Sequence, residues 1–281
     1  MGGLEEMANK TNITKVKGYE LVPTPENKLI FQEHEYVGKE PDTKFVYNTI
    51  KKVANRVGMK DIHVASWDCA DEENGIEKMK LGYYFGKAFT QHVIGPNIFS
   101  QPVSVSAHKG HSSNIFIFSG HYGVWQRPSD KRILCGYVES ERDGTLRPTC
   151  GAMGHVLNRL IGKEEVPKDL PEWDEDKIGK IVIGLMPFKD QFRKIYDSGA
   201  DHDEKMSRGM DFMVRKNIDV MTSRLVGILK GLPSHGSDHD DKKLVFGMLT
   251  MNRCKYSDTA LITHAYLIEK GIVYDLREHK I

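Results

Sequence analysis

The chain has 281 residues, 39% of them hydrophobic and 28% charged, which is the composition of an ordinary soluble globular protein. Its 40 basic and 39 acidic residues give a net charge of +1, which excludes a broad electrostatic attraction to nucleic acid or an anionic membrane. Four irregularly spaced cysteines exclude a disulfide scaffold, and neither a secretory signal nor a membrane span of roughly 20 apolar residues is present, so we expect an intracellular protein.

The first half of the chain predicts one domain behind a polar arm. Residues 1–42, which include Pro23 and Pro25, show little periodicity and are predicted as an N-terminal arm, followed by a single α/β domain over 43–281. Apolar residues recur at helical spacing over 43–57, and residues 62–65 alternate as a short strand that runs toward Cys69. A helix is expected over 73–89. The unbroken apolar run Ile115–Phe118 predicts a strand buried inside a sheet, with His121 leaving its carboxyl end.

The second half alternates predicted strands with predicted helices. Short strands are expected over 133–138, 181–185, 244–251 and 273–276. Helices are expected from Met153 to Ile161, with Gly162 as the stop, and from Asp203 to Gly231, where a methionine-rich apolar stripe indicates a core-facing helix. This alternation predicts an α/β fold with a mainly parallel central sheet flanked by helices.

Three residues stand out as candidate metal ligands. Cys69 follows a predicted strand, His121 follows another, and Cys150 precedes a predicted helix. Two thiolates and one imidazole, with a fourth position left for water, are typical of a catalytic zinc site. They lie 52 and 29 residues apart, which matches no compact metal motif, and single cysteines of this kind are also found as small buried hydrophobic residues.

Three short blocks resemble the limiting-CO2-inducible B/C protein family of algae and its relatives, a family similar to the β-type carbonic anhydrases. The blocks are Cys69-Ala70-Asp71-Glu72-Glu73-Asn74, Gly120-His121-Tyr122-Gly123-Val124 and Thr149-Cys150-Gly151-Ala152. The resemblance extends over roughly residues 45 to 252 and implies a β-carbonic-anhydrase-like fold, a Zn²⁺ ion on Cys69, His121 and Cys150, and a homodimer. It also makes the cytoplasm or the plastid stroma the expected compartment.

The resemblance further implies reversible hydration of CO2 to bicarbonate by zinc-bound hydroxide, because zinc lowers the pKa of bound water to near 7. Asp71 would accept the proton of this hydroxide or, in a resting form, ligate zinc itself, and His108 or His111 would carry protons away. The β-type enzymes have an arginine where this chain has Glu73. A catalytically silent zinc-binding relative that acts as a CO2 or bicarbonate sensor or as an assembly partner therefore remains the alternative.

Overall fold

The computed structural model describes residues 15–37, 40–60, 62–69, 81, 83–85, 88–93, 113–139, 144–163, 177–231, 242–253 and 259–281. Its strands are β1 (Lys15–Pro23), β2 (Leu29–Val37), β3 (His63–Cys69), β4 (Ala88–Val93), β5 (Ser113–Gln126), β6 (Ile133–Cys135), β7 (Tyr137–Glu139), β8 (Leu146–Pro148), β9 (Lys242–Arg253), β10 (Thr259–Glu269) and β11 (Ile272–Asp275). Its helices are α2 (Thr43–Arg56), α5 (Gly151–Ile161), α6 (Lys177–Leu185), the 3₁₀ turn η2 (Met186–Phe188), α7 (Lys189–Asp197) and α8 (His202–Gly231).

A nine-stranded sheet forms the centre of the molecule, in the order β2-β1-β10-β9-β5-β3-β4, with β11 beside β10 and β6 beside β5. The α/β class and the central sheet with flanking helices are confirmed. Parallel pairing is confined to β4, β3, β5 and β9, whereas β10, β1, β2 and β11 pair in antiparallel fashion. The sheet is therefore mixed, and its parallel half carries two of the candidate ligands, Cys69 and His121.

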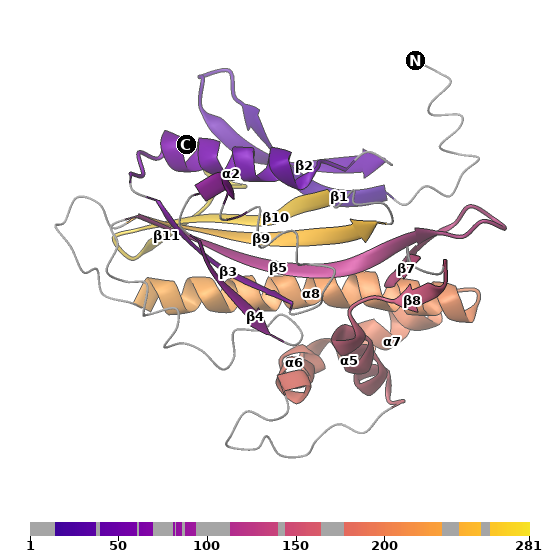
Figure 1. The fold of residues 1–281 in the computed structure, drawn as a ribbon. Helices are drawn as coiled ribbons and strands as arrows, with labels where there is room; N and C mark the ends of the chain where they lie inside the picture. Colours follow the sequence, from indigo (N-terminus) through magenta and orange to yellow (C-terminus); the bar gives the residue numbers. More distant parts are fainter. Residues whose placement is uncertain are drawn as a thin grey trace.

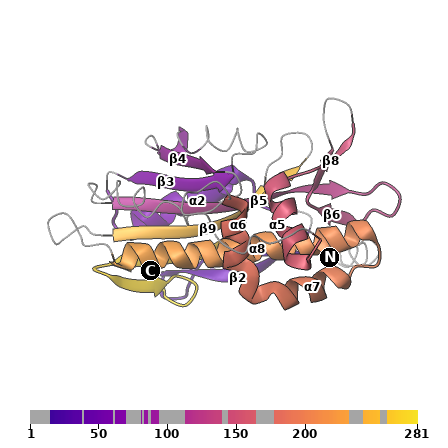
Figure 2. The same ribbon diagram turned by 90° about the horizontal axis from the view of Figure 1, so that it is seen from below.

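Helices cover both faces of this sheet (Figure 1). The helix α2 packs on one face, where Val46, Ile50 and Val53 join a core cluster with the sheet. The long helix α8 runs along the other face, and α5, α6 and α7 pack around it (Figure 2). The core on this side includes the stripe of Met210, Met213 and Met221, all at most 3% exposed. Among the described residues, no helix combines the length and apolar composition needed to cross a bilayer.

Most of the predicted elements are confirmed: α2, β3, α5, α8, β9 and β11 lie where the sequence pattern indicates them. The predicted strand over 181–185 is wrong, because these residues belong to helix α6. Ile181, Val182 and Leu185 are buried at helical spacing while Ile183 is exposed, and a five-residue apolar run cannot distinguish a buried helix from a strand. The predicted helix over 73–89 lies mostly outside the described residues; residues 81 and 83–85 are helical, but the predicted end is wrong because Ala88 and Phe89 begin strand β4, which pairs with β3.

Two further differences come from tertiary pairing. Residues 15–37, expected as part of an arm, form the hairpin β1–β2, and β1 pairs with β10 at Tyr19 and Ile262. The strand β10 itself has no counterpart among the predicted elements, although ten of its residues pair with β9. Because sheet pairing supplies most of the order in these segments, weak local periodicity does not reveal them.

A buried histidine of β10 makes the stability of this fold dependent on pH. His264 is 9% exposed and follows an irregularity in the register between β9 and β10. Burial lowers its pKa to about 4, although the nearby Asp219 carboxylate, 3.3 Å from Nε2, opposes this shift. Arg277 and Lys216 also lower this pKa, and Asp275 raises it. The imidazole is therefore neutral in the folded chain near pH 7.

We expect acid to destabilise the metal-free chain through His264. An unfolded histidine has a pKa of about 6.5, so the unfolded state binds this proton first as the pH falls. The contribution, up to about 3 kcal/mol in the free energy of unfolding, is present above pH ~6.5 and is lost toward pH ~4. Urea unfolding at several pH values should show that the free energy of unfolding falls less with decreasing pH in His264→Gln than in the wild type. The exposed His279→Gln variant is the control. Equal losses of unfolding free energy in wild type and His264→Gln would contradict the assignment of this pH dependence to His264.

Candidate metal centre

Cys69 lies at the end of a buried parallel strand. It is the last residue of β3, which lies between β4 and β5 and pairs in parallel with both. Trp67, two residues earlier, is fully buried and stacks on Phe116 of β5 with ring centroids 6.2 Å apart. Since sites in α/β sheets form at the carboxyl ends of parallel strands, this position suits a functional thiol. Cys69 itself is 3% exposed.

His121 lies within β5 and does not leave its carboxyl end as the sequence pattern suggested. The strand continues to Gln126 because β9 pairs with it over residues 113–124 and β6 pairs with its last three residues. His121 faces Thr250 of β9 in the register and is 1% exposed. The sequence predicted that the strand ends before His121, because Ser119, Gly120 and Gly123 interrupt the apolar pattern. These residues do not interrupt the backbone pairing of β5 with β9, so the prediction was wrong.

Cys150 sits in a left-handed backbone conformation, with φ 49° and ψ 78°, directly before α5. Non-glycine residues rarely adopt this conformation, and such residues concentrate at functional sites. Thr149 holds the turn against β5: its Oγ1 accepts a hydrogen bond from Gly123 N at 2.5 Å, and its N donates to Gly136 O at 2.8 Å. A Cβ at Gly123 would lie 2.0 Å from Thr149 Oγ1, so this approach requires glycine.

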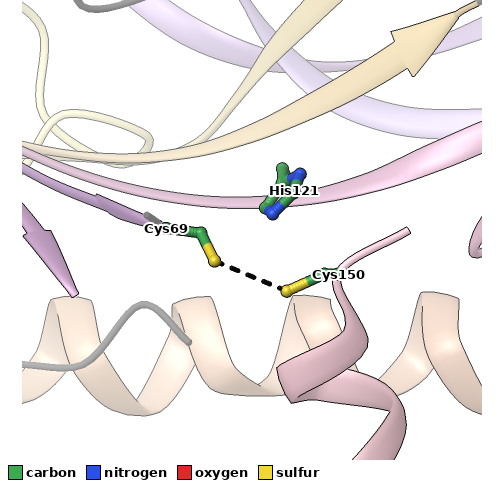
Figure 3. A group of neighbouring side chains, drawn as sticks. All are labelled: Cys69, His121 and Cys150. Atoms are coloured by element: carbon green, nitrogen blue, oxygen red, sulfur yellow. Dashed lines mark hydrogen bonds between the residues drawn. The ribbon is translucent and has the colours of Figure 1, made fainter. Parts of the chain in front are cut away.

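The structure brings the three predicted ligands together. One ligand atom from each of Cys69, His121 and Cys150 lies within 4.8 Å of the others, and all three residues are buried. Figure 3 shows the two sulfur atoms pointing toward each other, 3.6 Å apart, with the imidazole at β5. Two sulfurs on one tetrahedral zinc lie about 3.8 Å apart, whereas disulfide-bonded sulfurs lie about 2.05 Å apart. The donor set and its spacing therefore fit a metal ion.

Asn252 of β9 orients the imidazole, and sequence analysis did not identify it. Its Oδ1 lies 2.7 Å from His121 Nδ1, and the side chain is 1% exposed. Because an amide oxygen only accepts, this hydrogen bond places a ring proton on Nδ1 and leaves the lone pair for a metal on Nε2. The signal in the sequence was the polar pair Thr250 and Asn252 at alternate positions near the end of the apolar run that begins at Leu244.

Tyr122, the residue after His121 in β5, connects the candidate site to helix α8 by a hydrogen bond. Tyr122 is 1% exposed, and its hydroxyl donates a hydrogen bond to Asp211 Oδ1 of α8 at 2.7 Å. Arg215 Nε donates to the same oxygen at 2.8 Å. Burial, followed by the Asp211 charge, raises the pKa of Tyr122 well above its usual value, so the phenol stays protonated and remains a donor.

The other predicted site residues cannot be placed in this way. Asp71, His108 and His111 lie outside the described residues, as does Glu73. Their roles remain predictions from the sequence. Of the remaining cysteines, Cys135 lies at the end of β6, and burial raises the pKa of its thiol to about 12, which indicates an inert core residue.

Comparison with known proteins identifies the fold. No family model matches the chain, and no curated protein matches its sequence. The crystal structure of PtLCIB4, a homolog of the limiting CO2-inducible protein LCIB, superposes with a TM-score of 0.64 at 16% identity, covering 83% of this chain and 93% of the other. That of LCIB superposes with a TM-score of 0.53 at 12% identity, covering 84% and 93%.

A β-carbonic anhydrase, CafA of Aspergillus fumigatus, is matched at 14% identity over 74% of this chain and 79% of the other, with a TM-score of 0.35 that is too low to establish a shared fold. The LCIB matches do establish one. The likeness inferred from three short sequence blocks is thus confirmed at the level of structure: the chain has the fold of the limiting CO2-inducible protein LCIB and its homologues.

Proposed function

We propose that this protein is a zinc-dependent carbonic anhydrase that interconverts CO2 and bicarbonate. The observation that carries the proposal is the convergence of Cys69, His121 and Cys150, from three distant segments, to within 4.8 Å of one another. Three protein ligands of the Cys₂His type leave one coordination position open, which is the mark of a catalytic zinc site. The shared fold with a protein described as limiting CO2-inducible supports a role in CO2 chemistry.

Each residue has a distinct task in this proposal. Cys69 and Cys150 would hold the ion through their sulfurs, and His121 would hold it through Nε2. When bound, zinc would supply a Lewis acid that makes water nucleophilic near neutral pH. Asp71 would accept a hydrogen bond from the reacting water and orient its lone pair, and His108 would carry the released proton to solvent. The surrounding buried side chains, Trp67 and Tyr122 among them, exclude bulk water from the ligands.

The domain division and the oligomeric state remain predictions. We expect residues 43–281 to form the catalytic domain and the chain to act as a homodimer. Sedimentation of the purified protein at several concentrations tests the dimer directly.

A silent zinc-binding relative is the second candidate, favoured by one feature of the sequence. Glu73 occupies the position where β-type enzymes carry the arginine that pairs with the catalytic aspartate. Lysine, available nearby as Lys78, Lys80 or Lys87, is a point charge without the planar fork of arginine and would hold Asp71 less rigidly. Such a protein would bind CO2 or bicarbonate, or a partner, without turnover.

One experiment separates the two candidates. The zinc content of the purified chain and the exchange of ¹⁸O from labelled CO2 into water are measured on the same sample. The enzyme requires about one zinc per chain together with exchange that exceeds the uncatalysed rate. Zinc without exchange would favour the silent relative, and a chain without zinc would contradict both.

Replacing Asn252 should weaken the metal site without removing a ligand. We expect Asn252→Ala to lower zinc affinity by about 10- to 100-fold, because the ring of His121 loses the acceptor that fixes its orientation and tautomer. Asn252→Asp keeps an acceptor oxygen and should recover most of this affinity. Competition with a fluorescent zinc chelator measures both. Equal affinities in wild type and Asn252→Ala would show that Asn252 does not orient the ligand.

A further inference from the structure

A second polar group lies on the face of β3 opposite to Cys69 and, on β5 and β9, on the same face as His121 and Asn252. Side chains alternate along β3, so Trp67 and Cys69 join the core on the α8 side while Val64 joins the core on the α2 side. Ser66 and Asp68 share the face of Val64, and they are 2% and 5% exposed. Two polar side chains are thus buried on the side of the sheet that α2 covers.

These two residues line a small cavity. Its oxygen-bearing walls are Tyr47 of α2, Ser66 and Asp68 of β3, Ser119 of β5 and Thr250 of β9, and the remaining walls are apolar. The cavity volume is about 10 Å³. A polar cavity of about 10–15 Å³ is the smallest that holds a water molecule, and an internal water needs two to four polar partners. The size and the lining both match one water.

The hydroxyl groups of Ser66, Ser119 and Thr250 are incompletely satisfied by the described protein atoms. Ser66 Oγ is fully buried, and no described protein atom forms a hydrogen bond with it. The Ser119 and Thr250 hydroxyls lie 3.0 Å apart and share one hydrogen bond, so one of their two protons is left for another acceptor. An unmade hydrogen bond on a buried hydroxyl is costly, and a bound water removes that cost.

We propose that this cavity binds one internal water molecule. The Ser66 hydroxyl donates to it, the free proton of the Ser119–Thr250 pair reaches it, and the water donates to the Asp68 carboxylate. The water thereby links β3 to β5 and β9 next to the strand positions that carry Cys69, His121 and Asn252. The cavity lies beside the candidate metal centre, since Thr250 pairs with His121 in the sheet, but none of its lining residues is a proposed zinc ligand.

The direction of the Tm change in a Ser66→Ala variant distinguishes a cavity that holds water from an empty one. If water is bound, Ser66→Ala removes one of its partners and should lower the Tm of the metal-free chain by about 2 to 4 °C. If the cavity is dry, the same change removes an unsatisfied hydroxyl and should leave the Tm unchanged or raise it, which would overturn the proposal. Thr222→Val is the control, because its hydroxyl is equally buried without a partner but packs tightly against Gly247.

The control should not lose stability, since valine keeps the shape of threonine and removes only a buried hydroxyl that bonds to no described atom. A second measurement needs no variant. A high-resolution crystal structure of the wild-type chain should contain one ordered water within about 3.2 Å of Ser66 Oγ. An empty cavity in that map would overturn the proposal even if the Ser66→Ala chain failed to fold.

Discussion

Replacing Cys150 with serine should empty the metal centre. Zinc binds thiolate sulfur strongly, whereas the serine hydroxyl stays protonated near pH 7 and is a poor ligand. The zinc content after dialysis should fall from about one per chain to below about 0.1, because only Cys69 and His121 remain. The fold should persist, since Cys150 is a small residue at the start of α5 rather than a large core side chain. Elemental analysis and circular dichroism on the same sample measure both properties.

Cys135→Ala is the matched control for this change. Cys135 is also a buried free cysteine, at 6% exposure, but it lies outside the Cys–His–Cys group, and burial raises the pKa of its thiol to about 12. The control should keep its zinc. A Cys150→Ser chain that retains as much zinc as the control would contradict the proposed ligand set.

Replacing Asp71 with asparagine should abolish CO2 hydration while leaving zinc bound. Asparagine keeps the size of the side chain but loses the carboxylate that is proposed to accept a hydrogen bond from the reacting water. General-base and orienting groups of this kind contribute roughly 10²- to 10⁴-fold to a rate, so ¹⁸O exchange should fall by at least about 100-fold. Glu72→Gln removes the neighbouring carboxylate and serves as the control. Full exchange in Asp71→Asn would exclude the proposed role.

The sequence predicts those parts of the fold whose order is local. The helices α2, α5 and α8 carry clear apolar periodicity and capping residues, and the buried runs of β3 and β9 are continuous. The hairpin β1–β2 and the strand β10 depend on pairing between distant segments, which a local pattern does not record. The strand predicted over 181–185 was wrong for a different reason: its apolar run is too short to distinguish a helix from a strand.

The candidate ligands were identified by their types and by a family resemblance, and their convergence needed coordinates. Cys69 and Cys150 are 81 residues apart in the chain, yet their sulfurs lie 3.6 Å apart. The residues that support them are harder to infer. Asn252 forms a hydrogen bond with His121 although the two residues are 131 positions apart in the chain. The hydrogen bond from Gly123 to Thr149 likewise cannot be inferred from the sequence. Supporting contacts of this kind arise from the packing of strand ends, not from a motif.

X-ray absorption at the zinc edge of the purified protein tests the central claim most directly. We expect a first shell of two sulfur atoms at about 2.3 Å and two nitrogen or oxygen atoms at about 2.0–2.2 Å, from two cysteines, one histidine and one further oxygen ligand. A shell without sulfur, or one made of four sulfurs, would contradict the assignment of Cys69, His121 and Cys150 as the zinc ligands.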